Sequence, residues 1–385
     1  MQDAPIKLEI FRTSIAMRSF EHAAARRSAA EAVVTRMTFA DGAIAWGETL
    51  PRPYVTGETI DSVLADLESI FWPLVRNLPL EKFTYDILPQ VHQGRCVNAA
   101  ACAIEMPIWS RRIEHGPGEM TDQERRRPIA ARVSGVLGSS DPAKTARRLT
   151  LMRLFGLRDF KLKMGFGEEI DRENLRIVHK RIGRAIAARR CTLRVDVNGG
   201  WDVAGTPERA AELAAFGVMM IEQPVFCPAA EFVELARRCP LGLIADESLL
   251  TSADAKELSA EPRIAWNIRI SKNGGVGRAA ALAEMAHARN IPFIIGSMVG
   301  ESGILSAAQR RLLQSIPHPP SGEPFEPLFV EGNYGKFLLA DDLTKPSPRF
   351  GYGGRLNPLK SAGIGVNVDP KKLQQYGTLV KTLIA

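Results

Sequence analysis

The chain has 385 residues, of which 45% are hydrophobic and 24% charged, values typical of a folded protein with room for two domains. The net charge of +7 comes from separate arginine clusters without interleaved aromatic residues, which indicates solvated helix faces and no nucleic-acid partner. The sequence contains no apolar run of about 18 residues, no signal peptide and no CxxC pair among its five cysteines, so we expect a cytoplasmic protein without a membrane partner.

The first 128 residues are predicted to form an α+β domain. Alternating hydrophobic residues indicate strands at 6–11, 31–39 and 43–48. We expect long loops at 17–28 and 49–58. The pattern from residue 59 to about residue 113 is helical, with Pro and Gly breaks.

From residue 129, strands and helices alternate in units of about 25 residues. The predicted strands are 131–137, 159–164, 192–197, 218–222, 243–246, 265–270, 292–296 and 328–331. Eight such units close a ring, so the predicted fold class is α/β, with a (β/α)7β TIM-like barrel over residues 129–331. Residues 332–385 are expected to pack back on the first domain.

Charged residues end five of the predicted barrel strands. Asp196, Glu222 and Asp246 end three neighbouring strands, where three carboxylates repel one another unless a cation lies among them. Oxygen ligands alone favour Mg²⁺ first and Mn²⁺ second. Asn198 and Glu247 lie one or two residues beyond and are candidates to support the ligands. The alternative is that each acid pairs with an arginine or caps the next helix.

Two lysines complete this pattern. Lys163 ends the second strand and Lys272 the sixth, so they face each other across the barrel. One ammonium group on each side of a bound carboxylate suits removal of a proton from one face of a carbon and its return to the other. Lys161 has the same orientation as Lys163, and we expect it to favour the neutral form of Lys163 and to contact the substrate carboxylate. Taken singly, each lysine could also be a solvent-facing charge.

These motifs resemble those of the enolase superfamily and, within it, of the muconate-lactonising-enzyme subgroup. The resemblance rests on Lys161-x-Lys163, Asp196-x-Asn198, Glu222-Gln-Pro, Asp246-Glu247 and Lys272. It implies a capping domain over a (β/α)7β barrel, Mg²⁺ bound by the three acids, Lys163 and Lys272 as paired acid/base residues, and loops around Phe20 and Tyr54 that close over the substrate. The mandelate-racemase subgroup is disfavoured, because it needs a histidine base near the seventh strand and residues 296–301, where that strand ends, contain none.

The resemblance leaves several substrates open. The subgroup includes dipeptide epimerases, N-succinylamino acid racemases, o-succinylbenzoate synthases and muconate cycloisomerases. Residues 52–58 resemble the dipeptide epimerases, but the Asp-x-Asp that holds a substrate ammonium group after strand eight is absent, and Glu331 or Glu301 could replace it. Pro107 and Ser110 stand where the family usually has Ala and Asp. The candidate substrate-binding residues are Phe20, Arg52, Tyr54, Ser134, Ser297, Glu301 and Glu331.

We therefore predict a homo-oligomeric isomerase that removes a proton α to the carboxylate of a small molecule, through an enediolate. Racemisation or epimerisation of an amino-acid derivative or dipeptide is the leading hypothesis. The alternative is a cycloisomerase or β-elimination lyase in which Lys163 is the base and Lys272 only an electrostatic partner. A non-catalytic, metabolite-binding barrel is a remote third possibility.

Overall fold

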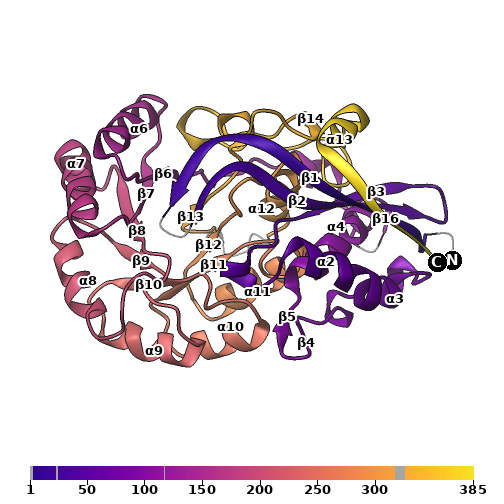
Figure 1. Cartoon of the computed structure of the whole chain (residues 1–385), viewed down its shortest axis with the longest axis horizontal. Helices are drawn as coiled ribbons and strands as arrows, with labels where there is room; N and C mark the ends of the chain where they lie inside the picture. Colours follow the sequence, from indigo (N-terminus) through magenta and orange to yellow (C-terminus); the bar gives the residue numbers. More distant parts are fainter. Residues whose placement is uncertain (1–2, 23–24, 117, 317–325) are drawn as a thin grey trace.

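The computed structural model describes residues 3–22, 25–116, 118–316 and 326–385. An antiparallel sheet with helices packed on it lies beside a barrel of alternating strands and helices (Figure 1). The last strand of the chain returns to the antiparallel sheet and pairs with the first strand.

The antiparallel sheet has four strands in the order β16-β1-β2-β3. Their bounds are Pro5–His22 (β1), Ala25–Phe39 (β2), Ile44–Thr49 (β3) and Gly377–Ile384 (β16). The prediction of a loop at 17–28 was wrong, because β1 and β2 take up most of that stretch. Antiparallel pairing provides hydrogen-bond partners for the backbone N–H and C=O groups of both strands. In a long loop, the same groups would have to form hydrogen bonds with solvent.

Short elements and one long helix follow β3. Their bounds are Pro53–Thr56 (α1), Ile60–Asp66 (α2), Leu67–Phe71 (η1), Trp72–Val75 (α3), Leu80–Lys82 (η2), Tyr85–Ile87 (η3), Val91–His92 (β4), Arg95–Cys96 (β5), Asn98–His115 (α4) and Asp122–Arg125 (α5). The long helix α4 packs closely on β3 at Gly47, where a Cβ would lie 2.5 Å from the carbonyl oxygen of Ala103. Only glycine allows this approach.

Pro107 and Ser110, which depart from the expected family pattern, lie in α4. At each position, a residue from outside the helix provides a hydrogen bond. Pro107 has no N–H to donate to the carbonyl oxygen of Ala103, four residues earlier. The hydroxyl of Thr35 donates to that oxygen instead, at 2.6 Å. The hydroxyl oxygen of Ser110 accepts a hydrogen bond from the backbone N–H of Ile364 at 3.2 Å. The helix therefore continues through both positions.

Eight parallel strands form the barrel, in sequence order from β6 to β13. The strands are Gly135–Leu137 (β6), Asp159–Lys163 (β7), Thr192–Asp196 (β8), Met220–Glu222 (β9), Gly242–Ala245 (β10), Ile264–Ile268 (β11), Phe293–Ile295 (β12) and Phe329–Val330 (β13). The helices are Pro142–Leu154 (α6), Glu168–Ala187 (α7), Thr206–Ala214 (α8), Ala229–Arg238 (α9), Ser252–Leu258 (α10), Val276–Ala288 (α11) and Gly303–Ser315 (α12). The backbone N–H of Ser134 donates to the carbonyl of Val330 at 2.8 Å and closes the ring. The predicted (β/α)7β fold is confirmed.

The barrel interior changes from apolar to polar along the strands. Near the strand starts, an apolar cluster is formed by Met220, Ile244, Ala265, Ile294 and Phe329. The next position with the same orientation lies two residues later on each strand. These positions hold Glu222, Asp246, Asn267, Gly296 and Glu331. A dry layer therefore supports a polar layer at the C-terminal ends of the strands.

The remainder of the chain consists of short elements that connect the barrel to the antiparallel sheet. They are Gly335–Phe337 (η4), Thr344–Lys345 (β14), Tyr352–Gly354 (η5), Asn367–Val368 (β15) and Pro370–Tyr376 (α13), followed by β16. In the described part of the chain, no helix is both long enough and apolar enough to span a membrane.

Buried glutamates connect the first third of the chain to the barrel helices. Glu105 in α4 accepts hydrogen bonds from the backbone N–H groups of Val276 and Gly277, at 2.9 and 2.8 Å, at the start of α11. Glu48 in β3 accepts hydrogen bonds from the backbone N–H and the hydroxyl of Ser302, at 3.0 and 2.8 Å, at the start of α12. The first N–H groups of a helix have no partner within it, so these acids provide the missing acceptors.

We expect Glu105→Ala to lower the free energy of unfolding by about 2–5 kcal/mol, because two buried N–H groups lose their acceptor at about 1–3 kcal/mol each. Urea denaturation monitored by circular dichroism measures the change. Glu105→Gln keeps one oxygen acceptor and should lose less, whereas the exposed Glu119→Ala is the matched control. Equal stability of the Glu105→Ala and Glu119→Ala variants would contradict the capping role.

Candidate active site

Three carboxylates lie at the ends of three neighbouring barrel strands. Asp196 is the last residue of β8, Glu222 is the last residue of β9, and Asp246 directly follows β10. Asp196 and Glu222 are paired in the register of β8 and β9. All three residues are fully buried. Because parallel strands of a barrel end at one rim, the predicted metal ligands share one end of the barrel.

Two cations lie between these carboxylates. Lys161 Nζ is 3.1 Å from Asp196 Oδ2 and 3.0 Å from Glu222 Oε1. The guanidinium of Arg269 is paired with Asp246 and lies 3.5 Å from Glu222 Oε1. Burial, aided by the charge of Asp196 and opposed by Lys161, raises the pKa of Glu222 to about 8. Among these carboxylates, Glu222 therefore lies where burial disfavours its ionised form.

The donor set suits a hard divalent cation, since all three candidate ligands are carboxylates. Within residues 3–22, 25–116, 118–316 and 326–385, no three Asp, Glu, His or Cys side chains are already grouped closely enough to hold a metal ion. Arg269 and Lys161 lie between the acids. Burial raises the pKa of Glu222, so a bound cation would favour its ionised form. The residues fit Mg²⁺ if Arg269 moves away from Asp246.

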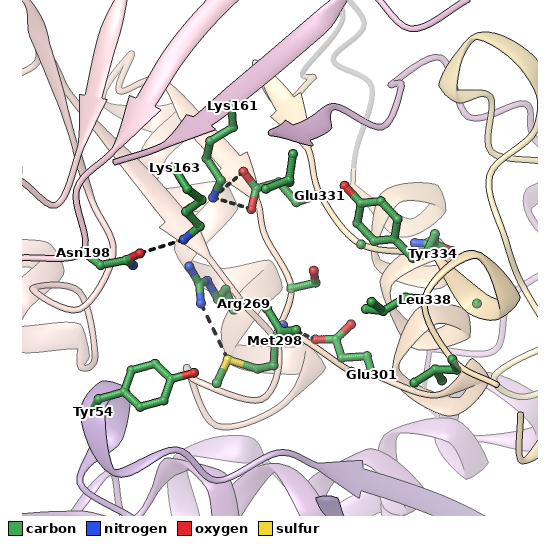
Figure 2. Close-up of a pocket in the computed structure, with 18 of the residues that line it drawn as sticks. Tyr54, Lys161, Lys163, Asn198, Arg269, Met298, Glu301, Glu331, Tyr334 and Leu338 are labelled. Atoms are coloured by element: carbon green, nitrogen blue, oxygen red, sulfur yellow. Dashed lines mark hydrogen bonds and ion pairs between the residues drawn. The ribbon is translucent and has the colours of Figure 1, made fainter. Parts of the chain in front are cut away.

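Lys163 occupies the position expected of a base. Its Nζ lies 2.6 Å from Asp196 Oδ2 and donates to Asn198 Oδ1 at 2.9 Å. Figure 2 shows the side chain extending from β7 to Asn198 at the edge of the cavity that it helps to line. Both partners lie on the β8 side, so the ammonium group is held in place while it remains accessible from the cavity.

Lys272 is placed differently. It is fully buried, and its Nζ donates to the backbone oxygen and Oδ1 of Asp246, at 2.6 and 3.0 Å. It is absent from the residues that line the cavity, whereas Lys163 is present. Burial, which outweighs the opposing charge of Asp246, lowers the pKa of Lys272. In this conformation Lys272 lies behind a carboxylate, and to reach a substrate it has to leave Asp246.

A cavity lies at the C-terminal ends of the strands and draws its walls from several parts of the chain (Figure 2). Tyr54 reaches it from α1, and Leu338 and Leu339 reach it from the segment after the barrel. The predicted site residues that line it are Lys161, Lys163, Asn198, Glu247, Tyr54, Ser297, Glu301 and Glu331. Its floor is charged and its walls are partly apolar, as in most small-molecule sites.

Glu331 is already neutralised by two cations. It lies 2.8 Å from Lys161 Nζ and 2.5 Å from the guanidinium of Arg194. Burial opposes ionisation, but these two cations hold the pKa of Glu331 at about 2. Lys161 also serves Glu222, and its own pKa is raised above the ordinary value because the surrounding carboxylates outweigh its burial. Glu331 therefore holds Lys161 rather than offering a free carboxylate to a substrate ammonium group.

Glu301 also lines the cavity, and little positive charge offsets the charge of its carboxylate. Its Oε1 accepts a hydrogen bond from the backbone N–H of Met298 at 2.6 Å (Figure 2). Burial raises the pKa of Glu301 to about 8. At neutral pH this carboxyl group is mostly protonated, so it can donate a hydrogen bond to an oxygen atom in the cavity.

Two predicted substrate-binding residues, Arg52 and Ser134, do not line the cavity. Arg52 is buried and donates to the backbone oxygens of Glu31 and Val299, which fixes the loop before α1. Ser134 lies in the barrel wall, where its hydroxyl accepts a hydrogen bond from Arg194 at 3.3 Å. The side chain of Phe20 lies outside the described residues.

The sequence interpretation missed two arginines of the site. Arg269 reaches Glu222 and Asp246, and Arg194 reaches Glu331. Arg194 lies two residues before Asp196, and Arg269 lies two residues after an inward-facing asparagine, so strand alternation assigns both to the barrel interior. That alternation is the signal that could have identified them.

Comparisons with known proteins agree on one family. A family model described as enolase C-terminal domain-like matches residues 143–372. N-succinyl-L-Arg/Lys racemase of Bacillus cereus is 29% identical over 288 residues, which cover 72% of this chain and 74% of the relative. The structure of muconate lactonizing enzyme from Pseudomonas fluorescens complexed with muconolactone has a TM-score of 0.80 and 26% identity, with 98% of this chain and 100% of that chain covered.

A dipeptide epimerase from Cytophaga hutchinsonii complexed with Mg and the dipeptide D-Ala-L-Val has the same fold. Its TM-score is 0.79 at 18% identity, and 99% of each chain is covered. Three proteins named for different substrates thus share the architecture of this chain.

Proposed function

The chain belongs to the enolase C-terminal domain-like family, and we propose that it racemises or epimerises a small carboxylate at the carbon next to the carboxyl group. The predicted resemblance and the predicted class, an isomerase, are confirmed by the relatives. The observation that supports the reaction most directly is Lys163, which is held against the buried carboxylate of Asp196 and borders the cavity.

The positions of these residues suggest a separate role for each of them in the reaction. In its neutral form, Lys163 accepts the α-proton on the cavity side. Lys272 serves the opposite face once its Nζ leaves Asp246. Glu301 donates a hydrogen bond to the substrate carboxylate while that group gains charge. When bound by Asp196, Glu222 and Asp246, Mg²⁺, or Mn²⁺ in its place, supplies positive charge that stabilises the negative charge developing on the substrate.

We propose an N-acylated amino acid as the substrate class in preference to a dipeptide with a free ammonium group. Glu331 is neutralised by Lys161 and Arg194, and Glu301 is mostly protonated at neutral pH. An ammonium group placed against Glu331 or Glu301 would therefore meet cations or a neutral acid. The apolar walls at Met298 and Leu338 suit an acyl chain or an apolar side chain.

Incubation of the enzyme with Mg²⁺ and candidate substrates in D₂O tests the proposal. N-acylamino acids should take up deuterium at the α-carbon with inversion, and free dipeptides should do so more slowly. Loss of water or lactone formation without racemisation would show that the chemistry is that of a lyase or a cycloisomerase.

One observation favours this second candidate. Lys272 is bonded to Asp246 and lies away from the cavity, an arrangement suited to chemistry with a single base. Lys163 then removes the proton, and Lys272 acts only through its charge. Muconate lactonizing enzyme, at 26% identity, shares this fold.

We expect activity to fall as the pH rises through about 8, because Glu301 loses the proton that it donates as a hydrogen bond. Glu301→Gln keeps a donor that does not titrate, so this alkaline decline should disappear. Glu301→Ala should reduce kcat by about 10²–10³-fold. The pH dependence of kcat from pH 6 to 10 measures both effects. An identical alkaline decline in the wild type and the Gln variant would assign the titration to another group.

The domain division, location and assembly remain proposals. Pairing of β16 with β1 supports the division into a capping domain at 1–128, a barrel at 129–331 and a returning segment at 332–385. All five cysteines are free, which supports a reducing, cytoplasmic location. Size-exclusion chromatography with light scattering tests the proposed homo-oligomer.

A further inference from the structure

A second cavity, of about 280 Å³, lies at the opposite end of the barrel from the carboxylates. Arg132 precedes β6 and Arg158 directly precedes β7, so both lie at the N-terminal ends of the strands. Lys163 ends β7 on the other side of the barrel, next to the catalytic cavity. The charged residues around this second cavity are Arg132, Arg153, Arg158 and Arg355.

In the part of the chain that the structure describes, these four arginines have no acidic partner. Among the described residues, none of them forms an ion pair, and no Asp or Glu lines the cavity. Arg153 is oriented by hydrogen bonds from its Nη1 to the carbonyl of Leu157 at 3.2 Å and to Cys191 Sγ at 3.0 Å. Four guanidinium groups around one hollow repel one another, and their fields add in it.

The opposite wall comes from the segment after the barrel. Arg355 and Tyr352 belong to it, and an isolated β-bridge joins Arg355 to Arg132. Gly353 has φ of 69°, a left-handed conformation that favours glycine, and its backbone lies beside the guanidinium of Arg132. The Tyr352 ring rests on Phe155, at 5.8 Å between centroids. Figure 1 shows this late segment beside α6.

We propose that this cavity binds a small anion that carries phosphate groups, of about the size of pyrophosphate. Planar guanidinium groups form paired, charge-assisted hydrogen bonds with phosphate oxygens, and several of them match the several charges of a polyphosphate. The volume lies just below the range of small-molecule pockets, about 300–1,000 Å³, which favours a compact ligand over a protein segment. The bound anion would join the late segment to β6, β7 and α6. This site is independent of the proposed isomerase activity.

Isothermal titration calorimetry with pyrophosphate and the full-length chain tests the site, at constant ionic strength and without added divalent cation. The wild type should bind one pyrophosphate, and Arg132→Gln/Arg158→Gln should bind it at least about ten-fold more weakly. The control is Arg76→Gln/Arg289→Gln, which removes the same charge at two exposed arginines that form no ion pair among the described residues. Circular dichroism and thermal melting without ligand establish that both variants are folded.

The outcomes separate clearly. Tight binding by the wild type and the control but not by the Arg132→Gln/Arg158→Gln variant supports the site. No binding by the wild type, or equal loss in both variants, overturns it, because net charge rather than geometry would then explain the affinity. Citrate serves as a carboxylate anion of similar charge, and citrate binding as tight as that of pyrophosphate would overturn the assignment to phosphate.

Discussion

Lys163→Ala is expected to slow proton exchange at the α-carbon by about 10²–10⁴-fold, the contribution typical of a positioned general base. The loss should depend on the enantiomer. The variant should no longer remove the proton that faces Lys163, whereas Lys272→Ala should fail with the opposite enantiomer. Deuterium incorporation into each enantiomer of an N-acylamino acid, followed by NMR, measures both effects.

Lys180→Ala, at an exposed position of α7, is the control for removing one lysine. If both enantiomers exchange at the wild-type rate in the Lys163→Ala variant, Lys163 is not the base. If Lys272→Ala slows both enantiomers equally, Lys272 acts through its charge alone, and the single-base alternative is favoured.

Glu222→Gln is expected to remove the response of the protein to Mg²⁺. The wild type should gain about 2.7 kcal/mol of unfolding free energy at a Mg²⁺ concentration one hundred times its Kd. The variant replaces a charged ligand with a neutral amide of nearly the same shape, so it should gain little. Urea denaturation in EDTA and in Mg²⁺ gives the difference, and calorimetric titration with Mg²⁺ gives the affinity directly.

Two comparisons make this result specific. Glu119→Gln, at an exposed residue, should keep the full stabilisation by Mg²⁺. In EDTA the Glu222→Gln variant should be as stable as the wild type, because burial already makes the ionised carboxylate costly. An unchanged Mg²⁺ response in the variant would exclude Glu222 from the metal site.

The barrel and the positions of its acids could be predicted because each depends on local pattern. A strand that ends on Asp196 or Glu222 places that residue at the rim, whatever the rest of the chain does. The division of charge within the site could not be predicted in this way. Whether Arg269 lies against Asp246, or Lys272 lies behind it, depends on contacts between side chains that follow two different strands, β10 and β11, which the pattern of one strand does not specify.

The first hairpin shows the same limit. Sequence alternation located the start of β1 and the end of β2, but it gave no sign that β1 continues to His22 or that β2 begins at Ala25. That length depends on pairing with β2, and register between strands is a property of two segments together. Likewise, Glu331 was predicted to contact substrate in place of the absent Asp-x-Asp, and its pairing with Arg194, 137 positions earlier in the chain, was not anticipated.

The pairing of β16 with β1 has a consequence for synthesis of the protein. Lys7 is paired with Ile384. During synthesis, the outer edge of β1 therefore stays uncovered until residues 377–384 have been made. During translation, β1 exposes unpaired backbone groups that can capture strands of other nascent chains. Closure of this sheet requires contacts of very high sequence separation, which form slowly. The outer edge of β1 is therefore among the last parts of this sheet to be enclosed.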